Sequence, residues 1–229
     1  MNTVLIGERY RKFLETHLKN QGFNTIWIPD NPNIDHRLAG HCDLSVFKYG
    51  KTIILSQHLE NDAVVNYLTQ RGYEVKISSF KQGKLYPDDV NLCAALVGDR
   101  LLHNPKLTDK SILKLSQDTI SVKQGYCRCM CLVLNNKSLI TSDAGIANTL
   151  ISCGYDVLLI NNGMISLPGF NYGFIGGAAF VNSDTVYFTG DIMKHPDGKK
   201  ICDFIHSRVM KIVCLTSNEL IDIGGAIVI

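Results

Sequence analysis

The amino-acid sequence predicts an α/β fold in which five repeated units close into a ring. Three observations lead to this prediction. A pattern of apolar strand, polar turn, helix and second apolar strand occurs five times along the 229 residues. Each unit after the first is preceded by a further apolar strand that leads into it through a short turn. The sequence also ends in an apolar stretch, "DIGGAIVI", whose side chains require burial.

The repeated units align at one apolar strand position. The first unit reads "NTVLIGE", "RYRKFLETHLKNQGF" and "NTIWIP", and the later units keep this order. A period of roughly 40–50 residues is typical of supersecondary repeats that bury an apolar face against their neighbours. The aligned residues are Val4, Ile53, Leu101, Leu139 and Val186. We expect one domain over residues 1–229, with units over about 1–40, 41–90, 91–126, 127–173 and 174–222 and a closing strand over 223–229.

The helices and turns inside the units follow from local spacing. Apolar residues recur at helical spacing in the second unit, which predicts a helix lying on a sheet. A glycine comes just before an aromatic residue at the end of three predicted helices, where a left-handed C-cap favours glycine. These glycines are Gly22, Gly72 and Gly154. The turn sequences "KYGK", "LNNK" and "VNSD" indicate that the extra strands form hairpins with the units that follow them.

The last residues predict how the ring closes. The first unit has no extra strand before it, so residues 224–229 are expected to pair beside residues 4–6 and take that place. Closure removes the free strand edges that would otherwise invite aggregation. The alternative is an open α/β sheet made of several βαβ units, which explains neither the hairpins nor the apolar final strand.

Composition limits the classes of partner and compartment. The formal net charge is +2, from 23 basic and 21 acidic residues, which gives no electrostatic footprint for nucleic acid or an anionic membrane. The start, "MNTVLIGERYRK", is too short in apolar residues for a signal peptide, and no apolar run reaches the ~18 residues of a membrane span. Eight cysteines without a secretion signal indicate reduced thiols, so we expect a cytoplasmic protein.

Five ββαβ units around a pseudo-fivefold axis resemble the pentein superfamily over essentially the whole chain. That superfamily contains the guanidino-group-modifying enzymes, such as the arginine and agmatine deiminases, and also a ribosome anti-association factor without catalytic activity. The resemblance implies a five-bladed α/β propeller near the deiminases. It also implies a ligand site at the centre, where the segments between blades converge.

Two of the segments between blades carry short deiminase-like motifs. The segment "AGHCDLSVF" resembles the G-H-x-D motif, which implies His41 as general acid/base and Asp43 as a ligand of the guanidinium. On a strand, positions i and i+2 share a face, so both side chains are expected to point at the axis. The segment "GYCRCMC" resembles G-x-x-R-C-M, which implies Cys129 as the nucleophile. For so short a motif as H-x-D, a solvated loop pair is the alternative.

The remaining segments match less well. "YPDDVNLC" resembles an Asn-containing substrate segment with Asn91 at the match, and a turn before a strand is the alternative. "LIDIGGAIVI" resembles E-G-G-D, with Asp222 one position out of register as either a substrate acid or a turn residue. "YGFIGGAAFV" has only glycine and alanine where the enzymes place an acid. The order His, Asn, Cys, Gly-rich segment, Asp is nevertheless the cyclic order of the deiminase motifs.

Three cysteines stand at alternate positions in "GYCRCMC". On a predicted strand Cys127, Cys129 and Cys131 would share one face, and they would span roughly 13 Å, which is too long to surround one tetrahedral metal ion. Cys127 and Cys131 are therefore expected to be packing residues. A structural zinc site built on the three thiols remains the alternative.

These residues point to one reaction class and one alternative. A thiol attacks an amidinium carbon only when activated, an imidazole can protonate the departing amine, and carboxylates hold a cation. We expect a cysteine-dependent hydrolase or transferase that acts on a small guanidino or amidino compound through a covalent thiouronium-type intermediate, with no cofactor or metal. The alternative is a non-catalytic pentein-fold protein that binds a small molecule or a protein partner. A homo-oligomer is left open.

Overall fold

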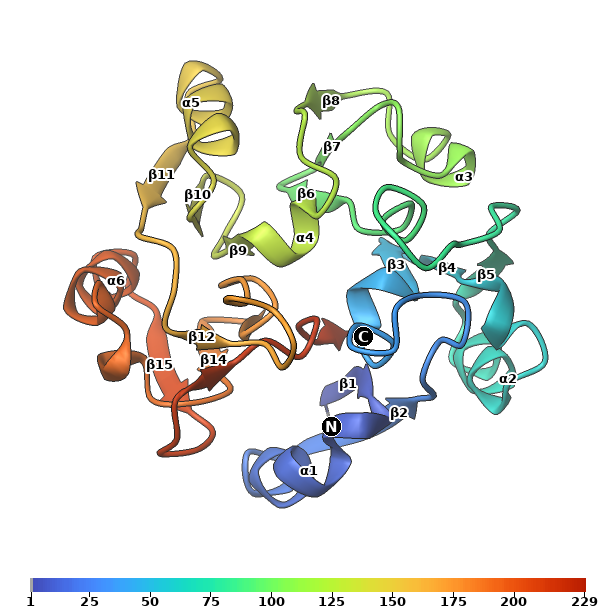
Figure 1. The fold of residues 1–229 in the computed structure, drawn as a ribbon, viewed down its shortest axis with the longest axis horizontal. Coiled ribbons are helices and arrows are strands. Elements are labelled where there is room, and N and C mark those ends of the chain that lie inside the picture. The colour runs from blue at the N-terminus through green and yellow to red at the C-terminus, as the bar shows by residue number, and fades with distance from the viewer. Residues whose placement is uncertain (1) are drawn as a thin grey trace.

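The structure, a computed structural model, describes residues 2–229 and has a mixed α/β fold. Its strands form five three-stranded sheets and one two-stranded sheet. Figure 1 shows these small sheets spread around a common centre in a propeller-like arrangement, with most of the helices on the outside. None of the helices within residues 2–229 is both long enough and apolar enough to span a lipid bilayer.

Each three-stranded sheet and its helix form one blade, numbered here along the chain. Blade one contains β1 (Asn2–Gly7), α1 (Arg11–Asn20), β2 (Phe23–Ile28) and β17 (Ile227–Val228). Blade two contains β3 (Val46–Tyr49), β4 (Thr52–Leu55), α2 (Ala63–Gln70) and β5 (Glu74–Ile77). Blade three contains β6 (Ala95–Val97), β7 (Arg100–His103), α3 (Lys110–Leu113) and β8 (Thr119–Ser121). Blade four contains β9 (Cys131–Val133), β10 (Ser138–Thr141), α5 (Ala144–Ser152) and β11 (Asp156–Leu159). Blade five contains β13 (Ala179–Asn182), β14 (Thr185–Phe188), α6 (Gly198–His206) and β15 (Lys211–Cys214).

Short elements connect the blades. They are α4 (Cys127–Met130), the 3-10 helices η1 (Glu8–Tyr10), η2 (Cys42–Leu44), η3 (Gln57–Leu59) and η4 (Ile192–Lys194), and the strands β12 (Ile165–Ser166) and β16 (Leu220–Ile221). β12 and β16 pair in parallel and form the two-stranded sheet. Two of these elements carry residues of the candidate site: Asp43 lies in η2 and Cys129 lies in α4.

All five blades have the same strand order. In blades two to five the middle strand is antiparallel to the strand before it and parallel to the strand that follows the helix. This confirms the predicted ββαβ unit. The five residues aligned in the sequence all lie in the middle strands and are 0% exposed: Val4, Ile53, Leu101, Leu139 and Val186.

The predicted pairing of the final strand is also present. β17 pairs with β1 in antiparallel fashion, with Val4 opposite Val228 and Leu5 opposite Ile227. β17 thus supplies in blade one the strand that β3, β6, β9 and β13 supply in the others. Within residues 2–229 the sheets remain separate and do not join into one closed sheet.

The hydrophobic core lies in wedges between neighbouring blades. One buried cluster joins each of the pairs one–two, two–three, three–four and four–five. A fifth cluster joins blade five to blade one, where Phe180 and Tyr187 pack with Val4, Leu14 and Phe23. Because each blade buries both of its faces against neighbours, no blade is expected to be stable alone.

The predicted glycine caps are confirmed. Gly22, Gly72 and Gly154 follow α1, α2 and α5 and have φ values of +79°, +78° and +80°. Only glycine adopts this conformation without steric cost, so each helix ends where the sequence indicated.

Candidate functional site

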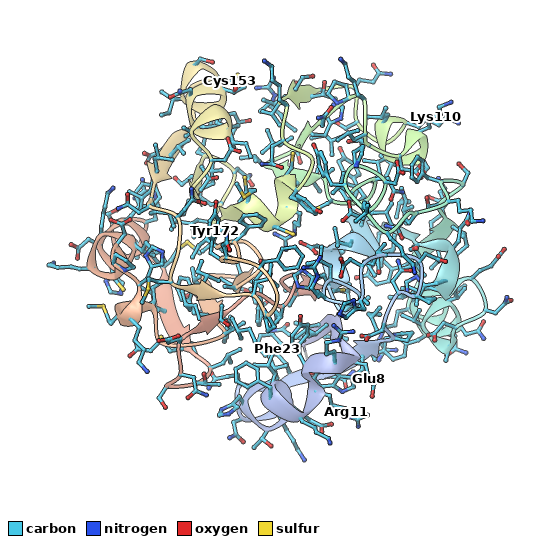
Figure 2. The ribbon with its side chains drawn as sticks, viewed as in Figure 1. Glu8, Arg11, Phe23, Lys110, Cys153 and Tyr172 are labelled. Atoms are coloured by element: carbon cyan, nitrogen blue, oxygen red, sulfur yellow. The ribbon has the colours of Figure 1, made fainter. Side chains whose placement is uncertain are left out.

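A cavity of about 100 Å³ is formed by segments that come just before inner strands of different blades. A thiol, an imidazole and a carboxylate line it together with apolar and aromatic side chains. The lining residues are Leu38, His41, Leu44, Tyr126, Cys129, Leu167, Phe170, Tyr172, Phe174 and Asp222. Figure 2 shows the side chain of Tyr172 near the centre of the view, between the blades. Larger hollows occur elsewhere, but among the described residues none of them combines these three chemical groups.

Four of the five predicted site residues form one cluster: His41, Cys129 and Asp222 line the cavity, and Asp43 contacts Cys129 beside it. Cys129 Sγ donates a hydrogen bond to Asp43 Oδ2 at 2.6 Å, and His41 Nδ1 lies 3.8 Å from Asp222 Oδ1. One ligand atom from each of His41, Asp43 and Cys129 lies within 4.8 Å of the others. All four residues are at most 2% exposed. Residues from three distant parts of the chain therefore form one buried polar cluster.

The local structure around His41 and Asp43 differs from the predicted strand. His41 is extended, but residues 42–44 form the 3-10 helix η2 and the strand begins only at Val46. The Asp43 N–H donates to the carbonyl of Gly224 at 3.3 Å. Gly224 has φ +72°, and a Cβ there would lie 2.5 Å from both Cα and Cβ of His41. The segment before β17 thus packs on this turn, and that long-range contact is not visible in local sequence.

The predicted strand through "GYCRCMC" is likewise wrong. Residues 127–130 form the helical turn α4, in which the Met130 N–H donates to the Tyr126 carbonyl at 2.9 Å. Positions i and i+4 of a helix share a face and position i+2 lies opposite. Cys127 and Cys131 accordingly pack in the core between blades three and four, whereas Cys129 faces the central cluster. This excludes a zinc site made by the three thiols, because they do not converge.

The glycine-rich segment of blade five has a packing role. A Cβ at Gly177 would overlap the carboxylate of Asp222, and one at Gly176 would overlap the carbonyl oxygens of the α4 region. Asp222 Oδ1 accepts from the Gly224 N–H at 2.9 Å, and Oδ2 accepts from the Phe174 N–H at 2.8 Å. Asp222 is therefore a buried, fully oriented carboxylate that the glycines make room for.

The electrostatics of the cluster are those of an anion-rich pocket. Burial raises the pKa of Asp43 to about 6, although nearby His41 and the hydrogen bond from Cys129 favour its ionised form. His41 Nε2 and Asp43 Oδ1 are buried and have no hydrogen-bond partner among residues 2–229. Asp43 and Asp222 share this buried site with one imidazole, and the charge of Arg128 also favours ionised Asp43. A bound cation would supply a direct partner for the unpaired Asp43 Oδ1.

The thiol of Cys129 rests in its protonated form. Its pKa is raised well above the ordinary value by the thiol of Cys93, by burial and by the charge of Asp43. The Sγ atoms of Cys93 and Cys129 are 3.7 Å apart. Cys93 lies in the cluster beside Cys129 and was not identified from the sequence, because "NLCAAL" looks like an ordinary buried strand.

The cavity wall is the other feature that the sequence did not indicate. Phe170, Tyr172 and Phe174 come from one loop of residues 167–174, and Tyr126 faces them from the turn before α4. The Tyr126 hydroxyl donates to Asp89 at 2.7 Å, which holds the ring in place. Aromatic faces around a cavity attract cations through the ring quadrupole.

Asn91, the fifth predicted site residue, makes its contacts elsewhere. It is 1% exposed, and its amide donates to Ser78 Oγ at 3.3 Å. The Ser78 hydroxyl in turn donates a hydrogen bond to the Asp109 carboxylate. The backbone N–H of Asp109 donates to the Asn91 carbonyl. Asn91 therefore belongs to a network that anchors the start of α3 and does not line the cavity.

The same cluster includes potential metal ligands. His41, Asp43 and Cys129 are the group of metal-ligating side chains that come close enough together among residues 2–229. Imidazole, carboxylate and thiolate are all ligands of zinc, but binding would require loss of the Cys129 proton.

Comparison with known protein families identifies one match. The model of the family of unknown function DUF6873 matches residues 5–227, almost the whole chain. The chain belongs to this family. No curated protein sequence matches it significantly.

Comparison with solved structures shows the fold of the pentein superfamily. The chain is similar to dimethylarginine dimethylaminohydrolase (DDAH) from Pseudomonas aeruginosa complexed with citrulline, with 10% identity, a TM-score of 0.57, and coverage of 99% of this chain and 98% of that one. It is also similar to inosamine-phosphate amidinotransferase from Streptomyces griseus, with 11% identity, a TM-score of 0.57, and coverage of 92% and 74%. A third similar structure is agmatine deiminase from C. jejuni, with 11% identity, a TM-score of 0.55, and coverage of 94% and 87%. At these identities the likeness establishes the fold of this DUF6873 protein.

Replacing Cys93 with alanine is expected to make Cys129 more reactive. The Cys93 thiol is the largest influence that raises the pKa of Cys129, so its removal increases the thiolate fraction at neutral pH. Alkylation by iodoacetamide should accelerate about threefold for every tenfold gain in thiolate, because a less basic thiolate is also less nucleophilic. Peptide mapping by mass spectrometry over time gives the rate at Cys129.

The matched control is Cys127→Ala, which removes a buried thiol from the adjacent core without touching the cluster. Equal rates at Cys129 in Cys93→Ala and the parent would show that Cys93 does not restrain the thiol.

Proposed function

We propose that this protein is a cysteine-dependent hydrolase or transferase that acts on a small guanidino or amidino compound. The observation that carries the proposal is the buried cluster in which Cys129, His41, Asp43 and Asp222 meet at one aromatic-walled cavity. The named activities of the similar structures, a dimethylaminohydrolase, an amidinotransferase and a deiminase, support the same reaction class.

The charge of the cluster selects the substrate class. Of the ion pairs formed by the described residues, the only one that includes either buried carboxylate is His41–Asp222 at 3.8 Å. A planar cation with several N–H donors would satisfy the unpaired Asp43 Oδ1 and neutralise the excess negative charge. The aromatic walls add attraction for the same cation. In the proposal Asp43 and Asp222 therefore hold the guanidinium or amidinium group.

The same cation would activate the nucleophile. Its positive charge next to Cys129 would lower the pKa of a thiol that the Cys93 thiol, burial and Asp43 otherwise hold protonated. The Sγ atom attacks the central carbon of the amidinium group while His41 takes the thiol proton, and His41 returns that proton to the departing amine as the C–N bond breaks. A cationic thiouronium remains on Cys129.

The second half of the reaction regenerates the thiol. Water attacks the thiouronium carbon and loses a proton to His41, the C–S bond breaks, and the Cys129 sulfur recovers a proton. The products are an ammonium ion or amine and a ureido or amide compound. In a transferase an acceptor amine takes the place of water.

The test compares the parent with Cys129→Ala on a panel of guanidino and amidino compounds, measuring release of ammonia or amine. We expect the parent to be active on at least one compound and the variant to be about a thousandfold slower or inactive, since the covalent route is lost. Cys127→Ala, which alters only the adjacent core, should retain activity. Activity that survives in Cys129→Ala would refute the proposed nucleophile.

The resting state of Cys129 favours a second candidate, a protein that binds a small cation without chemistry. A thiol that donates to a carboxylate and has a raised pKa is a stable arrangement in itself. Labelling with 2-chloroacetamidine separates the two candidates. An enzyme should be alkylated by this cationic reagent at Cys129 faster than at the exposed Cys153, whereas a binder should not.

We also propose that the five blades form a closed ring in a single domain. The pairing of β17 with β1 and the core cluster between blades five and one support closure. A cytoplasmic location is part of the proposal and is supported by eight free cysteines, five of which are buried as thiols.

A further inference from the structure

A second cavity, of about 220 Å³, lies beside the inner strands of the first three blades. It is distinct from the candidate site. His41 and Leu44, which come before β3, line the candidate site, whereas Val46–Lys48 within β3 line the second cavity. The full lining is Val46, Phe47, Lys48, Leu92, Ala94, Leu96, Arg128, Ile227 and Val228.

The charged residues that line this cavity are both basic, although Arg128 also interacts electrostatically with Asp43 of the neighbouring cluster. Lys48 and Arg128 are its charged residues, and no aspartate or glutamate lines it. Among the ion pairs formed by residues 2–229, none includes Lys48 or Arg128. The side chain of Arg128 makes one hydrogen bond, to the carbonyl of Ala226 at 3.1 Å, which leaves most of its N–H donors free.

Lys48 and Arg128 are both half-buried in this hollow and lose part of their hydration there. Burial, followed by the charge of Lys51, lowers the pKa of Lys48. An anion placed between Lys48 and Arg128 would restore favourable electrostatics and use the free donors of the guanidinium, which matches the geometry of carboxylate and phosphate. The surrounding Val, Leu and Ile side chains limit the size of such a ligand.

We propose that this cavity binds a small oxyanion, a short carboxylate or a phosphate, between Lys48 and Arg128. The site is independent of the proposed function, because it uses none of the residues assigned to the reaction. It is nevertheless next to them in the chain: Arg128 and Cys129 are consecutive residues of α4 that face different cavities.

The test is isothermal titration calorimetry of the full chain with inorganic phosphate and, separately, with propionate, at pH 7 and constant ionic strength set with chloride. We expect the parent to bind at least one of the two with a millimolar or lower Kd. Replacing Lys48 with glutamine should weaken binding about tenfold, the value of one charge-assisted contact. The preferred anion shows whether the site takes a carboxylate or a phosphate.

The matched control is Lys51→Gln. Lys51 is an exposed lysine in the turn after β3, so this change removes the same charge nearby but outside the cavity. Its Kd should stay within about twofold of the parent value, because Lys51 acts on Lys48 only through its charge and supplies no contact in the cavity. Arg128→Gln is the second variant and should also weaken binding about tenfold if Lys48→Gln proves unstable. The proposal fails if neither anion binds the parent, if Lys48→Gln and Arg128→Gln bind as the parent does, or if Lys51→Gln loses as much affinity as Lys48→Gln.

Discussion

Replacing Asp222 with asparagine is expected to lower the free energy of unfolding by about 2–4 kcal/mol and to abolish binding of a guanidinium group. The Asp222 carboxylate is 0% exposed and accepts hydrogen bonds from the backbone N–H groups of Gly224 and Phe174. An amide has only one acceptor oxygen, so its NH₂ group must face one of these donors. That leaves a buried N–H unpaired and loosens the aromatic wall that begins at Phe174.

Urea denaturation measures the loss of stability, and calorimetry with a guanidino ligand found in the screen measures the loss of binding. The matched control is Asp184→Asn, which removes an exposed carboxylate paired with Lys211 at 2.9 Å. That change should cost less than about 1 kcal/mol, as surface ion pairs do. Unchanged stability and unchanged ligand affinity in Asp222→Asn would contradict the role of this carboxylate as an anchor of the site.

Replacing Asp43 with asparagine is expected to remove a pH dependence of stability between about pH 4 and pH 6. Burial raises the pKa of Asp43 from 3.8 to about 6 in the folded protein, so the native state holds this proton more tightly than the unfolded chain. The free energy of unfolding that Asp43 contributes is therefore fully present below pH 3.8 and falls as the pH rises through 6. The difference over this window is about 3 kcal/mol.

Chemical denaturation of the parent and Asp43→Asn at several pH values between 4 and 6 gives this difference directly. The comparison removes the contributions of the other carboxylates, including those of Asp35 and Glu74, whose lowered pKa values give the opposite slope. The hydrogen bond from Cys129 favours ionised Asp43, so its effect is already included in the pKa of about 6. Parallel pH profiles of the two proteins would refute a strongly raised pKa at Asp43.

Much of the fold follows from the sequence because each blade is defined by local signals. Strand periodicity, turn residues and helix-ending glycines act over a few residues. The strand–helix–strand pattern recurs five times, and glycine ends three of the helices, as Gly22 and Gly72 do. The aligned apolar residues identify the middle strands for the same reason, since a middle strand is buried on both sides. Even the pairing of β17 with β1 follows from counting which unit lacks a strand.

The sequence predicted which residues belong to the candidate site, but it did not predict their local conformation or all of their neighbours. The motifs pointed to His41, Asp43, Cys129 and Asp222, which the structure brings together, and to Asn91, which anchors α3 instead. The strands predicted at His41 and at Cys129 are short helical turns, because contacts with residues far away in the chain override local periodicity there. Cys93 has no motif at all and is recognised only by its distance from Cys129.

The glycine-rich segment of blade five shows the difference between features that local sequence predicts and features that depend on long-range packing. The sequence alone shows that this segment lacks the acid found in the deiminases, and it predicts the order of the three strands in its blade. The strand boundaries differ, because β13 begins only at Ala179. The role of the small residues becomes visible in the folded protein, where Gly176 and Gly177 leave the space that the α4 turn and the Asp222 carboxylate occupy. The difference arises from how far apart in the chain the interacting residues lie. Repeats, caps and turns depend on neighbours a few residues away, whereas close packing of backbone against side chain depends on segments that meet only when the blades assemble.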